Sequence, residues 1–262
     1  MGESKNESGL LVFILPFLAV VPALYILEWE SYEASILIVA IPFMTFPVIL
    51  IAGQIYNGTE YWKDKLKEGG ILALGALAAS LSASLWLVYD YVDSLPDFND
   101  QQSITQWLEW VSFDLLQSDY TLTSGTKILG MGVWIDSITL MILFVATFLC
   151  FLICWFSLGY MNTDPINEDR NHRFYGEFVL FALGMFGMVL ADNFLWLFIF
   201  WEVMGLCSYL LIGFYYWKDS AAYASKKAFL TTRVGDVFLM ICLLYTSPSP
   251  RDQRGSRMPA SA

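Results

Sequence analysis

A series of long apolar runs constrains this chain more than any other feature. A bilayer core is about 30 Å thick, and a helix needs about 20 apolar residues to cross it. Because lipid offers the backbone no hydrogen-bonding partners, each crossing segment must be a helix that satisfies its own backbone. The runs predict seven spanning helices, over residues 10–27, 35–56, 70–92, 133–160, 174–190, 193–214 and 221–245.

The composition agrees with a membrane protein. Hydrophobic residues make up 57% of the 262 residues and charged residues only 15%, whereas soluble domains carry about 25% charged residues. The four cysteines lie inside apolar runs, where Cys behaves as a small hydrophobic residue, so they indicate neither disulfides nor a zinc site. We therefore expect an all-α, polytopic transmembrane helix bundle of about seven helices.

Four segments are distinguished along the chain. Residues 1–34 hold the first helix and an acidic connection, and residues 35–132 hold two helices and a long acidic outer loop. We expect short strands or a surface helix in this loop. Residues 133–245 hold the other four helices. The tail 246–262 is rich in Pro, Ser and Arg and is predicted to be non-native or disordered, so we expect no functional residue in it.

The positive charges predict the orientation. If the helices alternate, nearly all lysines and arginines outside the tail and the helix interiors fall on one side, and only Lys127 falls on the other. By the positive-inside rule the N-terminus is cytoplasmic and the acidic loop is outside. The net charge of −11 thus belongs mostly to the outer face. It is no argument for a particular partner, and we expect no nucleic acid.

Three charged residues lie deep in the predicted helices: Glu202, Arg233 and Asp236. A charge near the bilayer centre costs about 2.5–3.5 kcal/mol on insertion scales, so a chain that carries one usually uses it. Arg233 and Asp236 are three residues apart and can pair on one helix face. Lys226 lies one heptad before Arg233, and with Lys227 it extends the candidate proton-transfer residues. This row of charged residues along one helix face suits a proton relay. The alternative is that Arg233 and Asp236 form an ion pair that only fixes helix packing.

Other polar residues are weaker candidates. His172 lies between Asn171 and Arg173 in a predicted loop and is expected to be solvated. Glu177 lies close to the predicted cytoplasmic edge, and its side chain is expected to extend to the interface. No phosphate-binding loop, paired-histidine haem pattern, Ser/His/Asp constellation or cysteine cluster is found in the sequence. We therefore expect no redox centre in this chain.

Three motifs carry a family resemblance. Residues 201–214 (WEVMGLCSYLLIGF), 226–229 (KKAF) and 232–236 (TRVGD) closely resemble subunit 5, or subunit L, of proton-pumping NADH-quinone oxidoreductase, respiratory complex I. The resemblance runs over about residues 132–244. It includes the shorter motifs VWID, RFY and ADN, at 133–136, 173–175 and 191–193.

The resemblance implies a proton-translocating, antiporter-like subunit that couples quinone reduction to proton transfer. In it Glu202 matches the family's essential midplane glutamate, and Arg233 and Asp236 match the charged face of the following helix. As a translocase subunit the chain would hold no cofactor, because NAD, FMN, iron–sulfur clusters and quinone belong to partner subunits. Its partners would be the other membrane subunits of complex I and the lipid of an energy-transducing cell membrane.

The resemblance also implies an N-terminal part of the antiporter-like fold. The helix over 10–27 is one more than the family's usual start, and the family's later helices, with the lysine that partners the glutamate, do not follow residue 245. We therefore expect an N-terminal fragment. Two alternatives remain: a subunit of a multisubunit cation/proton antiporter, which shares these motifs, and a purely structural membrane subunit.

Overall fold

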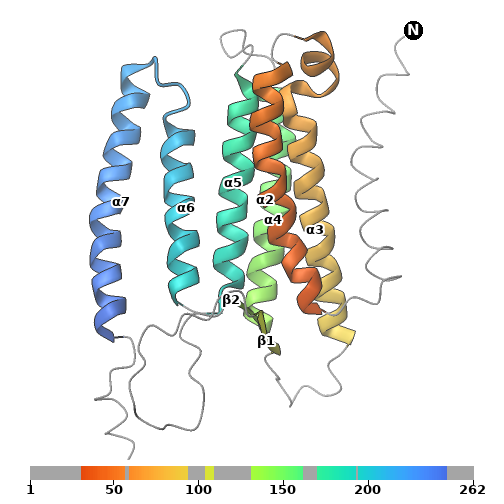
Figure 1. Ribbon diagram of the computed structural model, residues 1–262, viewed down its shortest axis with the longest axis vertical. Helices are drawn as coiled ribbons and strands as arrows, with labels where there is room; N and C mark the ends of the chain where they lie inside the picture. Colours follow the sequence, from red (N-terminus) through yellow and green to blue (C-terminus); the bar gives the residue numbers. More distant parts are fainter. Residues whose placement is uncertain are drawn as a thin grey trace, which may run out of the picture. The chain divides into compact units, whose positions relative to one another are not determined.

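The computed structural model describes residues 31–56, 59–93, 104–108, 131–161, 170–192 and 194–246. The chain forms two compact units, Met1–Cys207 and Ser208–Ala262, and each is described by itself. The elements, shown in Figure 1, are α2 (Ser31–Tyr56), the π-helix η1 (Tyr61–Lys65), the 3-10 helix η2 (Lys67–Gly69), α3 (Gly70–Asp93), β1 (Ile104–Leu108), β2 (Met131–Ile135), α4 (Ser137–Met161), α5 (Asn171–Leu190), α6 (Phe194–Ile212) and α7 (Asp219–Thr246).

The predicted all-α membrane bundle is confirmed. Helices α2 to α7 correspond to six of the seven predicted helices, and the predicted helix over 10–27 lies outside the described residues. Within the described part of the chain, the five helices from α2 to α6 are long and apolar enough to cross a membrane. Helix α7 is not in this group, so its membrane crossing stays a prediction. The tail beyond Thr246 also lies outside the described residues.

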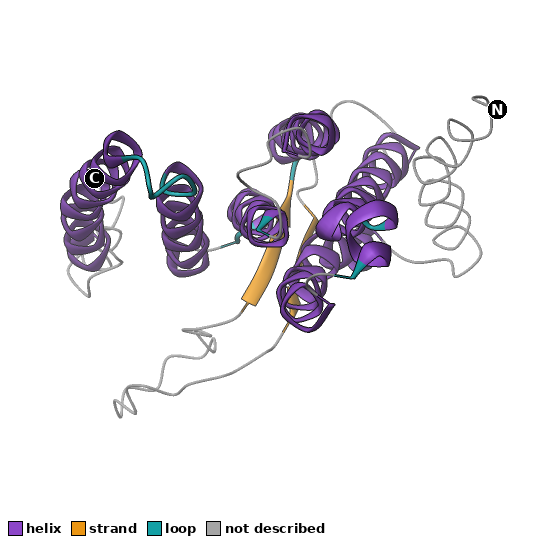
Figure 2. Cartoon of the chain, turned by 90° about the horizontal axis from the view of Figure 1, so that it is seen from above, coloured by secondary structure: helices purple, strands orange, loops and turns teal. Residues whose placement is uncertain are grey.

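Four helices of the first unit close a ring. Helix α2 packs against α3 and α5, and α4 packs against the same two helices. Figure 2 shows the helices end-on. Helix α3 is rich in Ala, Gly and Ser, which lets neighbouring backbones approach closely. Serines of α3 also form hydrogen bonds to the two neighbouring helices. The hydroxyls of Ser84 and of Thr147 in α4 are 2.9 Å apart, and Ser80 donates to the Ile38 carbonyl of α2 at 3.2 Å.

Helix α5 begins earlier than predicted because a distant carboxylate caps it. The backbone N–H of Asn171 donates to Oε2 of Glu68 at 2.8 Å, and Glu68 is only 4% exposed. Lys67, Glu68 and Gly69 all have positive φ angles, of 44°, 53° and 89°, a conformation that costs energy for residues other than Gly. The turn brings an anion to the positive end of the helix, where it satisfies one of the free N–H groups.

The expectation that His172 is solvated is wrong. His172 is the second residue of α5 and is only 7% exposed. Its imidazole packs against Gly53 of α2, where an added Cβ would collide with the ring. The cap at Asn171 therefore turns the predicted loop into a buried first turn of the helix.

Short strands lie at the other end of the ring. β1 pairs with β2 in antiparallel register, with Ile104 opposite Ile135, and Val133 forms a further bridge to Ala191 after α5. A strand in the acidic loop is thus confirmed. The predicted helix start at residue 133 is wrong, because residues up to Ile135 pair in the sheet and α4 begins only at Ser137.

Asp136 caps α4. Its Oδ1 accepts the backbone N–H of Thr139 at 2.6 Å, and this hydrogen bond lowers the pKa of the Asp136 carboxyl. Replacing a capping Asp by Ala costs about 1 kcal/mol, so we expect Asp136→Ala to destabilise the protein by about that amount. The folded-state pKa lies below the unfolded value of about 3.9. The ionic part of the stabilisation is therefore complete above the unfolded pKa and is lost as the pH falls through the folded one.

Thermal unfolding of the detergent-solubilised protein at several acidic pH values measures this effect. Asp136→Asn is the matched control, because the amide oxygen still accepts the hydrogen bond but does not titrate. The acid-dependent loss of stability should be smaller in Asp136→Asn than in the unmodified protein. Identical pH dependence in the two proteins would show that Asp136 is not its source.

Candidate functional site

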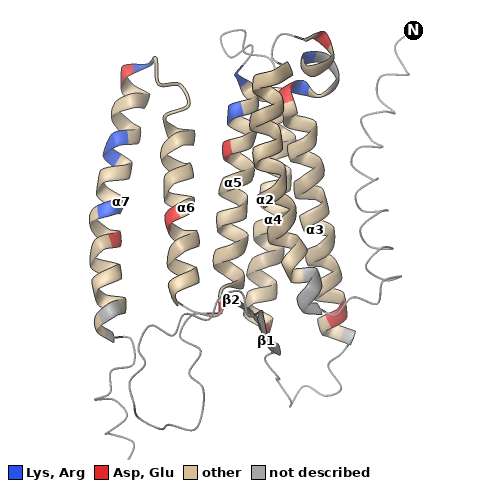
Figure 3. Ribbon diagram, viewed as in Figure 1, with Lys and Arg blue, Asp and Glu red and all other residues tan. Residues whose placement is uncertain are grey.

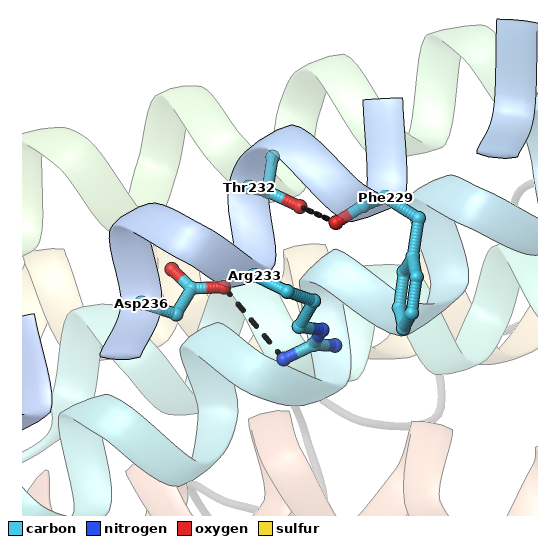
Figure 4. Close-up of polar contacts among 4 residues, drawn as sticks. All are labelled: Phe229, Thr232, Arg233 and Asp236. Atoms are coloured by element: carbon cyan, nitrogen blue, oxygen red, sulfur yellow. Dashed lines mark hydrogen bonds and ion pairs between the residues drawn. The ribbon is translucent and has the colours of Figure 1, made fainter. Parts of the chain in front are cut away.

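Arg233 and Asp236 form an ion pair on α7, as predicted from their spacing. Nη1 of Arg233 lies 3.7 Å from Oδ2 of Asp236, and Figure 4 shows the two side chains meeting along one helix face. Asp236 is only 8% exposed. The attraction within such a pair offsets part of the cost of placing each charge away from water.

An aromatic ring holds the guanidinium from the other side. The guanidinium carbon of Arg233 lies 4.7 Å from the ring centroid of Phe229, one turn earlier on α7. Cation–π contacts of this kind contribute about 0.5–1 kcal/mol at exposed sites and more when desolvated. Phe229 in turn packs against Tyr209 at the end of α6, with the ring centroids 5.0 Å apart. Arg233 is therefore fixed between an aromatic ring and a carboxylate.

Lys226 and Lys227 lie earlier on α7 and are both exposed. Lys226 is seven residues before Arg233, about 10.5 Å along the helix. Asp236 is ten residues after Lys226, about 15 Å along the helix, which is too far for a direct ion pair. Figure 3 shows how the charged residues of α7 spread along its length. The two lysines stay predicted members of the site.

Glu202 lies on α6, in the first unit, and is partly buried. An added Cβ on Gly184 of α5 would lie 3.2 Å from both the Met204 nitrogen and the Phe200 oxygen, so this side of α6 packs closely on α5. Glu202 is two residues from each of them, which places it on the opposite side of α6. Tyr209, one heptad later, shares the face of Glu202. The structure thus pairs Arg233 with Asp236 in one unit and places Glu202 in the other.

Glu177 is a largely buried carboxylate. Its position near the end of the helix predicts that the side chain can extend to the interface, and in the structure that side chain is 12% exposed. Oε1 of Glu177 lies 4.0 Å from Nη2 of Arg173, whose own side chain is 54% exposed. Glu177 lies one heptad before Gly184 and therefore shares the α5 face that packs on α6. The heptad spacing to a glycine, a residue typical of close helix contacts, is the sequence signal that could have found it.

The close approach at Gly184 leads to a testable prediction. A Leu side chain there would meet the α6 backbone, which cannot rotate away, so we expect Gly184→Leu to destabilise the protein by about 1–3 kcal/mol. Gly75→Leu is the control, because an added Cβ at Gly75 of α3 meets nothing within 4 Å. Thermal unfolding of both variants measures the difference. Equal melting temperatures would contradict the tight packing of α5 on α6.

Two segments of the chain match models of known protein families. Residues 122–175 match the model described as "NADH-Ubiquinone oxidoreductase (complex I), chain 5 N-terminus". Residues 191–248 match the model described as "NADH:quinone oxidoreductase/Mrp antiporter, TM". The second match contains all of the predicted site residues: Glu202, Lys226, Lys227, Arg233 and Asp236.

Three relatives illustrate the similarity. NAD(P)H-quinone oxidoreductase chain 5 of Synechocystis sp. is 33% identical over 214 residues, which are 81% of this chain and 28% of the relative. NADH-quinone oxidoreductase subunit L of Mycobacterium tuberculosis is 35% identical over 212 residues, 80% of this chain and 29% of the relative. F(420)H(2) dehydrogenase subunit L of Methanosarcina mazei is 34% identical over 204 residues, which are 77% of this chain and 27% of the relative. The chain thus spans less than a third of these relatives.

Proposed function

We propose that this chain, which belongs to the antiporter-like family of complex I subunit 5 or L, translocates protons as a membrane subunit of a quinone oxidoreductase. The observation that carries the proposal is the partly buried Arg233–Asp236 pair, in the same matched region as Glu202. Ionisable residues inside membrane helices are costly and typically mark ion or proton pathways. Three ionisable residues within one matched segment favour a role in proton transport over a role in helix packing alone.

Each charged residue has a proposed role. Glu202 takes up and releases the transported proton, because its carboxylate lies in an otherwise apolar helix. Arg233 and Asp236 set the electrostatic field along α7, since each charge of the pair favours the ionised form of the other. Lys226 and Lys227 extend the positive charge toward the start of α7. No step in this scheme transfers an electron within the chain.

The wider assignment follows from the same proposal. NAD, FMN, iron–sulfur clusters and quinone would be held by partner subunits, and the other membrane subunits of the complex would be the protein partners. The N-terminus would be cytoplasmic in an energy-transducing membrane. The division into 1–34, 35–132, 133–245 and 246–262 is proposed on sequence grounds.

The intact complex that contains this subunit tests the function. Reconstituted into proteoliposomes, it should acidify the vesicle interior when an electron donor and a quinone are added, and a protonophore should abolish the signal. The word antiporter in the matched description supports a second candidate, a cation/proton antiporter. That candidate predicts proton movement driven by an imposed sodium gradient without any electron donor. Such a result, with no donor-dependent acidification, would replace the first proposal by the second.

A further inference from the structure

A second carboxylate lies inside a membrane-spanning helix and has no place in the scheme above. Glu177 is the seventh residue of α5, so it lies about 9 Å along the helix from its start. One carboxylate oxygen faces the Arg173 guanidinium at 4.0 Å. The other, Oε2, is buried and has no hydrogen-bond partner within the described residues. A buried oxygen left in this state costs free energy, and such an exception in a folded protein needs an explanation.

The surroundings of Glu177 are polar on one side only. Arg173, one turn earlier, is half exposed, and its guanidinium lies beside the carboxylate. On α6, Cys207 is fully buried and interacts electrostatically with Glu177. Toward the membrane interior the same α5 face continues with Gly184, where the two helices close. Glu177 thus lies between a half-exposed guanidinium and a closed helix contact.

We propose that Glu177 is a second proton-exchange carboxylate, which passes protons between water at the Arg173 end of α5 and the α5–α6 interface. In the step, the carboxylate takes one proton from a hydronium ion, which gives a neutral carboxylic acid and a water molecule. A water molecule then takes the same proton, which restores the carboxylate and forms a hydronium ion, and no electron moves. The inference rests on the proposed function and adds a site to it.

Glu177 and Glu202 serve different faces of α6. Glu177 faces the side that carries Cys207, whereas Glu202 faces the opposite side. Along the helix, Glu202 is five residues, about 7.5 Å, from Cys207. The two carboxylates therefore exchange protons on separate sides of the helix, and loss of one leaves the other in place.

Neutral replacement of Glu177 in the intact complex is the test. Glu177→Gln keeps the size and polarity but cannot carry a proton, so donor-driven proton flux into proteoliposomes should fall on the order of tenfold or more. Glu177→Asp should retain pumping with a displaced pH profile. Arg173→Gln should reduce the flux, and Arg173→Gln combined with Glu177→Gln should reduce it no further than Glu177→Gln alone. Glu60→Gln, at an exposed position, is the control.

The outcomes separate this inference from the proposed function. If Glu177→Gln pumps at the unmodified rate while Glu202→Gln does not, the role of Glu177 is overturned and the proposed function stands. If the unmodified complex does not pump, the proposed function itself fails. The amount of subunit in the purified complex shows whether each variant assembles. Where Glu177→Gln does not assemble, the pH profile of Glu177→Asp decides, and an unchanged profile overturns the inference.

Discussion

Glu202→Gln is expected to abolish proton pumping by the intact complex, lowering the flux by about 100-fold or more, the range typical of a lost proton-transfer group. Gln keeps the shape of Glu and its hydrogen-bonding capacity but cannot bind and release a proton near neutral pH. The measurement is donor-driven acidification of proteoliposomes. Glu202→Asp should restore part of the flux because it restores the carboxyl group.

Glu60→Gln again provides the matched control, since Glu60 is an exposed carboxylate at the start of η1. It should pump at the unmodified rate. Unchanged pumping by Glu202→Gln, with the complex fully assembled, would reduce Glu202 to a structural residue. The charges of α7 alone would then have to carry the proposed function.

The second large effect concerns the Arg233–Asp236 pair, where removal of one partner is expected to harm stability more than removal of both. Arg233→Leu leaves Asp236, only 8% exposed, without the cation that compensates it. Breaking a buried pair in this way costs about 3–5 kcal/mol, and the Arg233 side chain, 26% exposed, places the expected loss at the lower end. Replacing both residues, Arg233→Leu with Asp236→Met, substitutes apolar packing for the pair and should recover most of the stability.

The double variant should keep most of its stability and lose its proton transport. Thermal unfolding of the purified complex measures the first, and donor-driven acidification measures the second. We expect a stable double variant that no longer pumps, because the field that controls the proton is gone. A double variant that is stable and pumps normally would favour the alternative in which the buried charges only fix helix packing.

Much of the fold could be predicted because membrane helices depend on local composition. An apolar run satisfies its own backbone wherever it lies, so α2, α3 and α6 begin and end within a few residues of their predicted bounds. The errors arise where a distant segment intervenes. Glu68 caps α5 across 103 residues of chain, through two non-glycine residues in the left-handed region, and no local pattern indicates that.

In the candidate site, too, features set by neighbouring residues could be predicted and features set by distant segments could not. Arg233 and Asp236 lie within one turn of one helix, so their spacing alone predicts the pair. Glu177 could not be judged in that way, since its burial depends on which face of α5 packs on α6. His172 was missed for a related reason: its solvent exposure depends on where α5 begins, and that is decided by Glu68.

Infrared difference spectroscopy of the working complex tests most directly whether Glu202 changes its protonation state. A protonated carboxyl group has a C=O stretching band that the carboxylate lacks. We expect a carboxyl band that appears or disappears during turnover in the unmodified complex and is missing in Glu202→Gln. Identical difference spectra for the unmodified complex and Glu202→Gln would contradict it.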